Sequence, residues 1–384
     1  MTGFQFNTTK SLICRPGSAA DLANSLGQAL GGRLLVVTDP GIRSLGLMDA
    51  ALASLSAAGL EAHVFDRVEA DPSRSTLMAA VTAGHDFGAT GVIGFGGGSS
   101  LDVAKLAALL LGSDQPLDEA WGVGNAKGPR LPLALVPTTA GTGSEVTPVS
   151  IITVEGDEKR GVSSPVILPD IAVLDADLTL GLPPAITAAT GVDAMVHAIE
   201  AFTSRSPNNN PLSRMLAREA LRLLGANIET VCKDGKNRQA REAMLLGSML
   251  AGQAFANSPV AAVHALAYPV GGIFHIPHGL SNALVLPHVL RFNAQVEPGL
   301  YDEIAADAFP ALGETGQGRT TAFIDALVDL SARLGLPPRL RDAGIPEDAL
   351  PRMAADAMKQ QRLLVNNPRP VSEADALDIY RAAW

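Results

Sequence analysis

The first half of the sequence alternates short apolar runs, rich in Val, Ile and Leu, with segments of helical periodicity. Apolar runs of this length, bounded by Gly, Pro and polar residues, are typical of strands buried on both faces of a parallel sheet. The predicted strands are residues 33–38, 62–65, 91–95, 133–136, 151–153 and 171–174, and predicted helices cover residues 49–58 and 101–111 and begin near residue 72. Strands that alternate with helices predict an α/β domain with a Rossmann-like parallel sheet.

The pattern changes at Pro183-Pro184, after which helical segments are joined by short polar loops. Residues 206–211 form one such loop, and Pro337-Pro338 interrupts another helical stretch. A chain of 384 residues is long enough for two domains with separate cores. We therefore expect an α/β dinucleotide-binding domain over residues 1–182 and an all-α domain, carrying the metal site and the catalytic residues, over residues 183–384.

Composition excludes several classes of function. Hydrophobic residues make up 47% of the chain and charged residues 18%, which is typical of a globular protein. The net charge is −10 without a basic cluster, so neither nucleic acid nor an anionic membrane surface is an expected partner. Two cysteines cannot form a disulfide framework, the N-terminus lacks a signal pattern, and the longest apolar run is too short to span a bilayer. We expect a cytoplasmic location.

A glycine-rich stretch, Gly96, Gly97, Gly98 and Ser99, lies between a predicted strand and a predicted helix. Glycines let the backbone approach a phosphate closely, and the N–H groups at a helix start attract an anion. The stretch departs from G-x-G-x-x-G because Ser99 stands in place of the third glycine. On the residues alone, an ordinary tight turn remains an equal alternative.

A second polar loop, residues 138–145, follows the next predicted strand. Its hydroxyl side chains can bind phosphate, ribose or the nicotinamide amide, and the candidates are Thr138, Thr139, Thr142 and Ser144. The alternative is a turn in which these hydroxyls satisfy the local backbone.

Asp39 stands at the end of the first predicted strand, where acidic residues bind the adenosine ribose in dinucleotide folds. A carboxylate there also repels a 2′-phosphate, which favours NAD. An Asp-Pro-Gly turn over residues 39–41 is a second reading, and the two are compatible.

Asp193 and His197 are four residues apart in an apolar helical segment, so both side chains leave one face of the helix. A buried carboxylate is unfavourable unless it is paired or bound to a metal. His264 and His278 also lie in apolar or glycine-containing surroundings. One Asp and three His suit a divalent ion such as Fe(II) or Zn. The residues alone leave satisfied core histidines as an alternative.

Five segments together resemble the iron-containing alcohol dehydrogenase family. They are GGGSSLDVAK (96–105), PTTAGTGSEVT (137–147), GVDAMVHAIEAF (191–202), AVHALAYPVGG (262–272) and IPHGLSNALVLPHVLRFN (276–293). The resemblance extends over nearly the whole chain and implies the two-domain architecture of dehydroquinate synthase-like proteins. It implies that Asp193, His197, His264 and His278 hold the catalytic metal.

The resemblance also implies an NAD site. The pyrophosphate would bind at Gly96–Ser99, the loop from Thr138 to Ser144 would contact the cofactor, and Asp39 would select NAD. Further implied cofactor-binding residues are Asp102, Lys159 and Leu178. For Lys159, an ordinary surface lysine is an open alternative.

The activity implied is that of a metal-dependent alcohol dehydrogenase, which transfers a hydride between NAD(H) and a primary alcohol/aldehyde pair. Fe(II) is the expected metal, with Zn as an alternative in vitro, and the metal acts as a Lewis acid on the substrate oxygen. The expected partner is a small-molecule alcohol or aldehyde. By analogy with the family, the chain is expected to form a homodimer or a larger homo-oligomer.

One position departs from the family pattern. Tyr268 stands where the family often has a proton-handling His, four residues after His264. The proton route and the substrate class are therefore open, with Tyr268 and His275 as candidate residues. Alternatives within the same architecture are maleylacetate reductase and hydroxyacid-oxoacid transhydrogenase activity. A dehydroquinate synthase-like lyase would need several Lys or Arg near the ligands, and the ligand segments contain few.

Overall fold

The computed structural model describes residues 3–155, 158–313 and 318–384. The chain divides into two compact units, one formed by Asn7–Leu180 and the other by Met1–Phe6 together with Gly181–Trp384. The N-terminal residues belong to the second unit, where the Gln5 backbone N–H donates to the side chain of Asn208 and the Asn208 amide donates to the Gln5 carbonyl.

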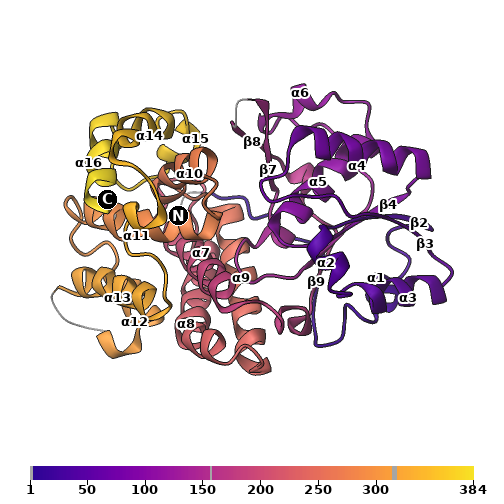
Figure 1. Ribbon diagram of the computed structural model, residues 1–384, viewed down its shortest axis with the longest axis horizontal. Coiled ribbons are helices and arrows are strands. Elements are labelled where there is room, and N and C mark those ends of the chain that lie inside the picture. The colour runs from indigo at the N-terminus through magenta and orange to yellow at the C-terminus, as the bar shows by residue number, and fades with distance from the viewer. Residues whose placement is uncertain (1–2, 156–157, 314–317) are drawn as a thin grey trace. The chain divides into compact units, whose positions relative to one another are not determined.

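The unit of residues 7–180 is built on a six-stranded parallel sheet in the order β1-β9-β6-β4-β2-β3 (Figure 1). The strands are β1 (Ser11–Cys14), β2 (Arg33–Val37), β3 (Glu61–Phe65), β4 (Gly91–Gly96), β6 (Leu133–Pro137) and β9 (Ile171–Leu174). This confirms the predicted α/β fold with a parallel sheet. The strand order reverses at β2, since β3 lies on one side of it and β4 on the other, and ligands bind at such a reversal in open α/β sheets.

Helices cover both faces of this sheet (Figure 1). Because successive side chains of a strand point to opposite faces, each strand contributes to two cores. Leu34 and Val36 of β2 pack in the core that includes α1 (Leu22–Leu26) and α3 (Asp49–Ala57). Leu35 and Val37 pack in the core that includes α4 (Arg74–Phe87) and α5 (Gly98–Gly112). The continuous apolar runs in the sequence follow from this burial on both sides.

Two features of this unit differ from the predictions. Strand β1 was not predicted, because its exposed or half-exposed residues at the sheet edge lack an apolar signature. Residues 151–153 lie in β7 (Val149–Thr153), which pairs antiparallel with β8 (Lys159–Ser163) in a separate sheet that also contains β5 (Gly122–Val123). An apolar run signals a strand but does not specify its partner.

The described part of residues 181–384 contains helices and no strand, which confirms the predicted all-α second half. The helices are α7 (Pro184–Thr203), α8 (Pro211–Lys233), α9 (Arg238–Asn257), α10 (Ala262–Phe274), α11 (His278–Ala294), α12 (Asp302–Ala308), α13 (Arg319–Arg333), α14 (Leu350–Ala357), α15 (Gln361–Leu364) and α16 (Glu373–Ala383). Helix α7 packs against α8, α9 and α11, and nearly all its residues after the first turn are buried.

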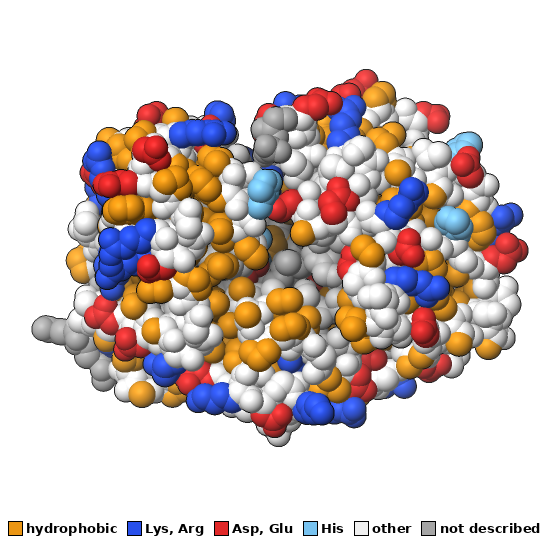
Figure 2. Space-filling model, viewed as in Figure 1, with side chains coloured by type: hydrophobic (Ala, Val, Ile, Leu, Met, Phe, Trp, Pro, Cys, Tyr) orange, Lys and Arg blue, Asp and Glu red, His pale blue; other side chains and the backbone are white. Residues whose placement is uncertain are grey.

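Charged side chains of both signs are distributed over the face shown in Figure 2. On the face shown in Figure 2, Lys and Arg are interspersed with Asp and Glu, so no extended basic area is present there. Within the described ranges, no helix combines the length and the apolar character needed to cross a membrane.

Candidate metal centre and cofactor site

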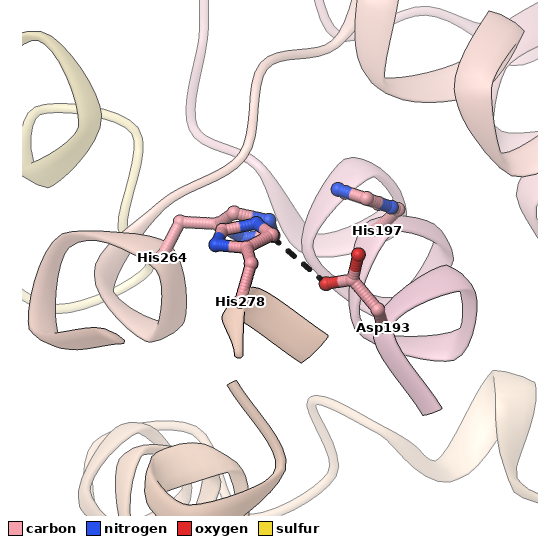
Figure 3. Close-up of side chains that lie close together, drawn as sticks. All are labelled: Asp193, His197, His264 and His278. Atoms are coloured by element: carbon pink, nitrogen blue, oxygen red, sulfur yellow. Dashed lines mark ion pairs between the residues drawn. The ribbon is translucent and has the colours of Figure 1, made fainter. Parts of the chain in front are cut away.

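Four predicted metal ligands lie together in the helical unit (Figure 3). Asp193 and His197 extend from α7, His264 from the first turn of α10, and His278 from the first residue of α11. One donor atom from each lies within 4.8 Å of the others. Asp193, His197 and His264 are almost fully buried, whereas the His278 side chain is 35% exposed. Four donors therefore converge on one point that solvent reaches beside His278.

Glu200 orients one of these histidines. It lies on α7 one turn beyond His197, and one of its carboxylate oxygens is 2.6 Å from Nδ1 of His264. The other oxygen accepts the backbone N–H of Val263 at 2.7 Å. A carboxylate in this position accepts a hydrogen bond from Nδ1–H, which leaves the lone pair of Nε2 directed at the cluster as a potential metal ligand. The sequence analysis did not identify Glu200, although a residue three positions after His197 lies on the same helix face.

Asn282 was also missed. Its amide Nδ2 donates to Asp193 Oδ1 at 2.6 Å and lies 3.3 Å from Nε2 of both His264 and His278. It is one turn after His278 on α11 and is fully buried. Its amide group therefore contacts the donor atoms of three predicted ligands.

The start of α11 lies unusually close to α7. A Cβ at Gly279 would stand 2.4 Å from the carbonyl oxygen of Ala189 and 3.2 Å from Cβ of Asp193. Such contacts leave no room for a side chain, so only glycine fits there. The two backbones touch one residue away from His278.

Electrostatics around Asp193 favour its charged form. Burial alone would raise the pKa of this carboxyl, but the adjacent His197, His278 and His264 and the Asn282 hydrogen bond hold it below its usual value. The anion is thus retained in an interior position, as a metal ligand requires. His197 stacks on Phe255 and on the ring of His264, which fixes its plane.

Tyr268 lies beside this cluster, one turn after His264 on α10, with its ring centroid 6.2 Å from that of His278. Its hydroxyl accepts a hydrogen bond from Arg362 of α15 at 3.2 Å. Arg362 is 94 residues away from Tyr268 in the chain, outside the segments that contain the predicted ligands, so the sequence does not indicate that the two are neighbours. His275, the other candidate, is exposed and ends α10 in a left-handed conformation.

The glycine-rich stretch and Asp39 meet where the sheet order reverses. Gly96 has a φ of +154°, and a Cβ there would stand 3.3 Å from Oδ2 of Asp39. Gly97 precedes α5 without a side-chain cap, so the first N–H groups of this 15-residue helix are available to an anion. Asp39 caps α2 (Pro40–Ser44), since its Oδ1 accepts the Ile42 N–H at 2.9 Å. Its other oxygen remains directed toward the glycine-rich stretch.

The Thr/Ser loop borders the same stretch and also forms a buried network. A Cβ added at Gly97 would stand 3.8 Å from the Thr139 side chain, and one added at Gly98 would stand 2.8 Å from the Thr142 side chain. Thr138 is buried and Ser99 is half-buried. Ser144 donates to Asp102 at 2.6 Å and accepts from Lys105 at 2.8 Å. Lys105 is fully buried and also donates to Thr147 and to the Val149 carbonyl. Burial lowers the pKa of Lys105, opposed by Asp102 and Glu145.

Two further predicted cofactor residues have other partners. Lys159 of β8 forms an ion pair with Asp71 at 2.5 Å, and its side chain is only 10% exposed, so it is not an ordinary surface lysine. Leu178, in the 3-10 turn Ala176–Thr179, packs in the core on the α1 and α3 side of the sheet.

Comparison with known proteins gives matches over both halves of the chain. The profile of iron-containing alcohol dehydrogenase matches residues 9–176, and that of the C-terminal region of the Fe-containing alcohol dehydrogenase family matches residues 187–384. A long-chain-alcohol dehydrogenase of Geobacillus thermodenitrificans is 41% identical over 91% of this chain and 89% of its own. A sulfoacetaldehyde reductase of Bilophila wadsworthia is 36% identical over 99% of this chain and 98% of its own.

Solved structures agree with these matches. A crystal structure of 1,3-propanediol oxidoreductase covers 100% of both chains with a TM-score of 0.95 and 33% identity. The sulfoacetaldehyde reductase of Bifidobacterium kashiwanohense, solved in complex with NAD+, covers 100% of this chain and 99% of its own, with a TM-score of 0.87 and 28% identity.

Proposed function

The chain belongs to the iron-containing alcohol dehydrogenase family and is an alcohol oxidoreductase, and we propose that it uses NAD and a divalent metal ion to interconvert a primary alcohol and an aldehyde. The observation that carries the proposal is the convergence of Asp193, His197, His264 and His278. Fe(II) is the proposed resident metal, with Zn able to replace it in vitro.

The four donors fit such an ion. Bonds from Zn or Fe(II) to His nitrogen and carboxylate oxygen are about 2.0–2.2 Å long, so two ligands of one ion are separated by at most about 4.4 Å. The donor atoms, within 4.8 Å of one another, need to approach by only a few tenths of an ångström. The buried Asp193 carboxylate and the Glu200-oriented His264 are the ligand types that such a site requires.

The ion supplies Lewis acidity toward an alcohol or carbonyl oxygen. The chain's own residues hold the donors in place, since Glu200 fixes the His264 ring and the packing of His197 between two rings fixes a second ligand. The partial exposure of His278 leaves an approach for a small substrate.

For the cofactor, we propose that the carboxyl ends of β2, β4 and β6 bind NAD. The start of α5 with Gly96–Ser99 would hold the pyrophosphate, and Asp39 would accept hydrogen bonds from the adenosine ribose. Thr138, Thr139 and Thr142 would contact the cofactor directly. Asp102 and Ser144 would support the loop through their mutual hydrogen bond, and Lys159 and Leu178 would lie at the edge of the site.

We further propose a homodimer or larger homo-oligomer and a cytoplasmic location. The relatives named above act on substrates as different as long-chain alcohols and sulfoacetaldehyde, so family membership leaves the substrate open.

The experiment is a substrate assay on protein reconstituted with Fe(II) or with Zn, in which NADH absorbance reports turnover of a panel of primary alcohols. We expect metal-dependent NADH formation and about one ion per chain by elemental analysis. His264→Ala should lower metal content and turnover together, whereas His85→Ala, an exposed histidine of the other unit, should change neither. Absence of a stoichiometric ion after reconstitution would contradict the proposal.

A further inference from the structure

We propose that Arg362 is an anion-binding residue beside the metal centre, and that the preferred substrate is a short aldehyde or alcohol with a carboxylate or sulfonate at its other end. The inference rests on the proposed alcohol dehydrogenase function and specifies its substrate class. It starts from the contact between Arg362 and Tyr268.

The position of Arg362 relative to the cluster follows from two contacts. Its Nη2 donates to the Tyr268 hydroxyl at 3.2 Å, and its guanidinium carbon is 5.9 Å from the centre of the Tyr268 ring. That ring is 6.2 Å, centre to centre, from the ring of His278, the half-exposed member of the metal cluster. One aromatic side chain, that of Tyr268, therefore lies against both the guanidinium and a proposed ligand.

The charge of Arg362 lacks a counterion within the described residues, because no described carboxylate forms an ion pair with it. Several other arginines of the helical unit differ, since Arg205 pairs with Glu297, Arg214 with Glu303, and Arg291 with Asp325. A guanidinium has five N–H donors in a planar fork that matches carboxylate or sulfonate oxygens, and the contact with Tyr268 uses one of them.

Arg362 is also held in place. It is half-buried, the next two residues, Leu363 and Leu364, are buried, and its carbonyl accepts a hydrogen bond from the Asn366 amide at 3.0 Å. A positioned guanidinium loses less conformational entropy when it binds an anion than a mobile surface arginine does. The role of Tyr268 is then to position the Arg362 guanidinium through the hydrogen bond that its hydroxyl accepts.

Two other roles are separable by experiment. If Arg362 only positions Tyr268, its loss should affect neutral and anionic substrates equally. If it binds a cofactor phosphate, its loss should raise the KM for NADH. If Arg362 forms an anion subsite, its loss should instead change the ratio of kcat/KM between anionic and neutral substrates of similar shape.

The assay compares the reduction of two matched pairs by metal-reconstituted enzyme. One pair is 4-oxobutanoate and its methyl ester, and the other is sulfoacetaldehyde and methylsulfonylacetaldehyde. We expect the wild type to prefer the anion, and Arg362→Gln to reduce that preference about ten- to hundredfold, the size of a charge-assisted hydrogen-bond pair. Arg362→Lys should retain part of it, and Arg352→Gln, a variant of an exposed arginine on α14, should retain all of it. The pair of substrates whose anion preference falls more in Arg362→Gln shows whether the subsite favours a carboxylate or a sulfonate.

Binding of succinate and sulfoacetate, measured by calorimetry on the same proteins, tests the subsite without turnover. Anion binding that is present in the wild type and lost in Arg362→Gln supports the subsite. If the same wild-type protein reduces no aldehyde, the proposed function is wrong but the subsite stands. The inference is overturned if the wild type shows no anion preference and binds neither anion, or if Arg362→Gln lowers both members of a pair equally.

Discussion

The Glu200 carboxylate lies 2.6 Å from Nδ1 of His264, and the same side chain accepts the backbone N–H of Val263. The helix that carries Asp193 and His197 thus also orients a predicted ligand on another helix, because Asp193, His197 and Glu200 lie on one face of α7. The same two turns of α7 therefore supply two predicted ligands and the carboxylate that orients a third.

Glu200→Gln should weaken metal binding about 10- to 100-fold, the usual effect of losing a carboxylate that orients a ligating histidine. The amide keeps the size of the side chain but no longer attracts the Nδ1 proton as a charge does. Competition with a chelator measures the Kd for Fe(II) or Zn. Glu219→Gln, on the exposed surface of α8, should match the wild type, and an unchanged Kd in Glu200→Gln would contradict the assigned role.

NAD should be preferred over NADP, because a 2′-phosphate near Asp39 is repelled by its carboxylate. We expect a ratio of kcat/KM of roughly 10 to 100, equivalent to about 1–3 kcal/mol. Asp39→Asn is the matched variant, since it removes the charge but keeps an acceptor for the Ile42 N–H that begins α2. The preference should fall in Asp39→Asn and in Asp39→Gly, and equal use of both cofactors by the wild type would refute the prediction.

Tyr268→Phe should retain most of its activity toward a neutral alcohol. The Tyr268 hydroxyl, which stands in place of the imidazole that the family often has at this position, accepts a hydrogen bond from Arg362. Loss of a required general acid or base lowers rates about 10²–10⁴-fold. A loss of that size in Tyr268→Phe, with metal content and NAD affinity unchanged, would make the phenol a catalytic residue. Tyr268→His should add an ionisation near neutrality to the pH–rate profile.

Stability should depend on pH through Glu145, which is buried in the unit of residues 7–180, with one carboxylate oxygen that has no hydrogen-bond partner among the described residues. Burial raises the pKa of Glu145 from its ordinary value of 4.5 to about 7. A group whose pKa is higher in the folded state stabilises that state at low pH, and this contribution is lost as pH rises through the folded value. Unfolding of the wild type should therefore become easier between about pH 4.5 and 7 relative to Glu145→Gln, which stays neutral. Denaturant titrations across this range test the prediction, and parallel profiles for the two proteins would contradict it.

The parts of the fold and site that depend on local periodicity could be predicted from sequence. Buried parallel strands are recognisable as apolar runs, and the four-residue spacing of Asp193 and His197 places both on one helix face. The addition of His264 and His278 required the resemblance to a family, because nothing in the local pattern indicates which distant helices meet. Their assignment as metal ligands stays a prediction.

Features that depend on tertiary contacts were missed for the same reason. Arg362 lies on a four-residue helix far along the chain from Tyr268, and only folding brings the two together. Asn282 and Glu200 lie close in sequence to the predicted ligands, but residue type and spacing do not indicate that an amide and a second carboxylate contact those ligands. Strand β1 has no apolar pattern because it is an edge strand with exposed side chains.

The close approach of Gly279 to the Ala189 carbonyl constrains the dimensions of the proposed metal centre. Side chains can change rotamer to suit a larger or smaller ion, but two main chains in contact cannot move closer, and they separate only if a whole helix shifts. The distance between the donors of α7 and the first residue of α11 is therefore a property of the backbone. We therefore expect selection among ions by radius at the proposed site to depend on how these two helices cross.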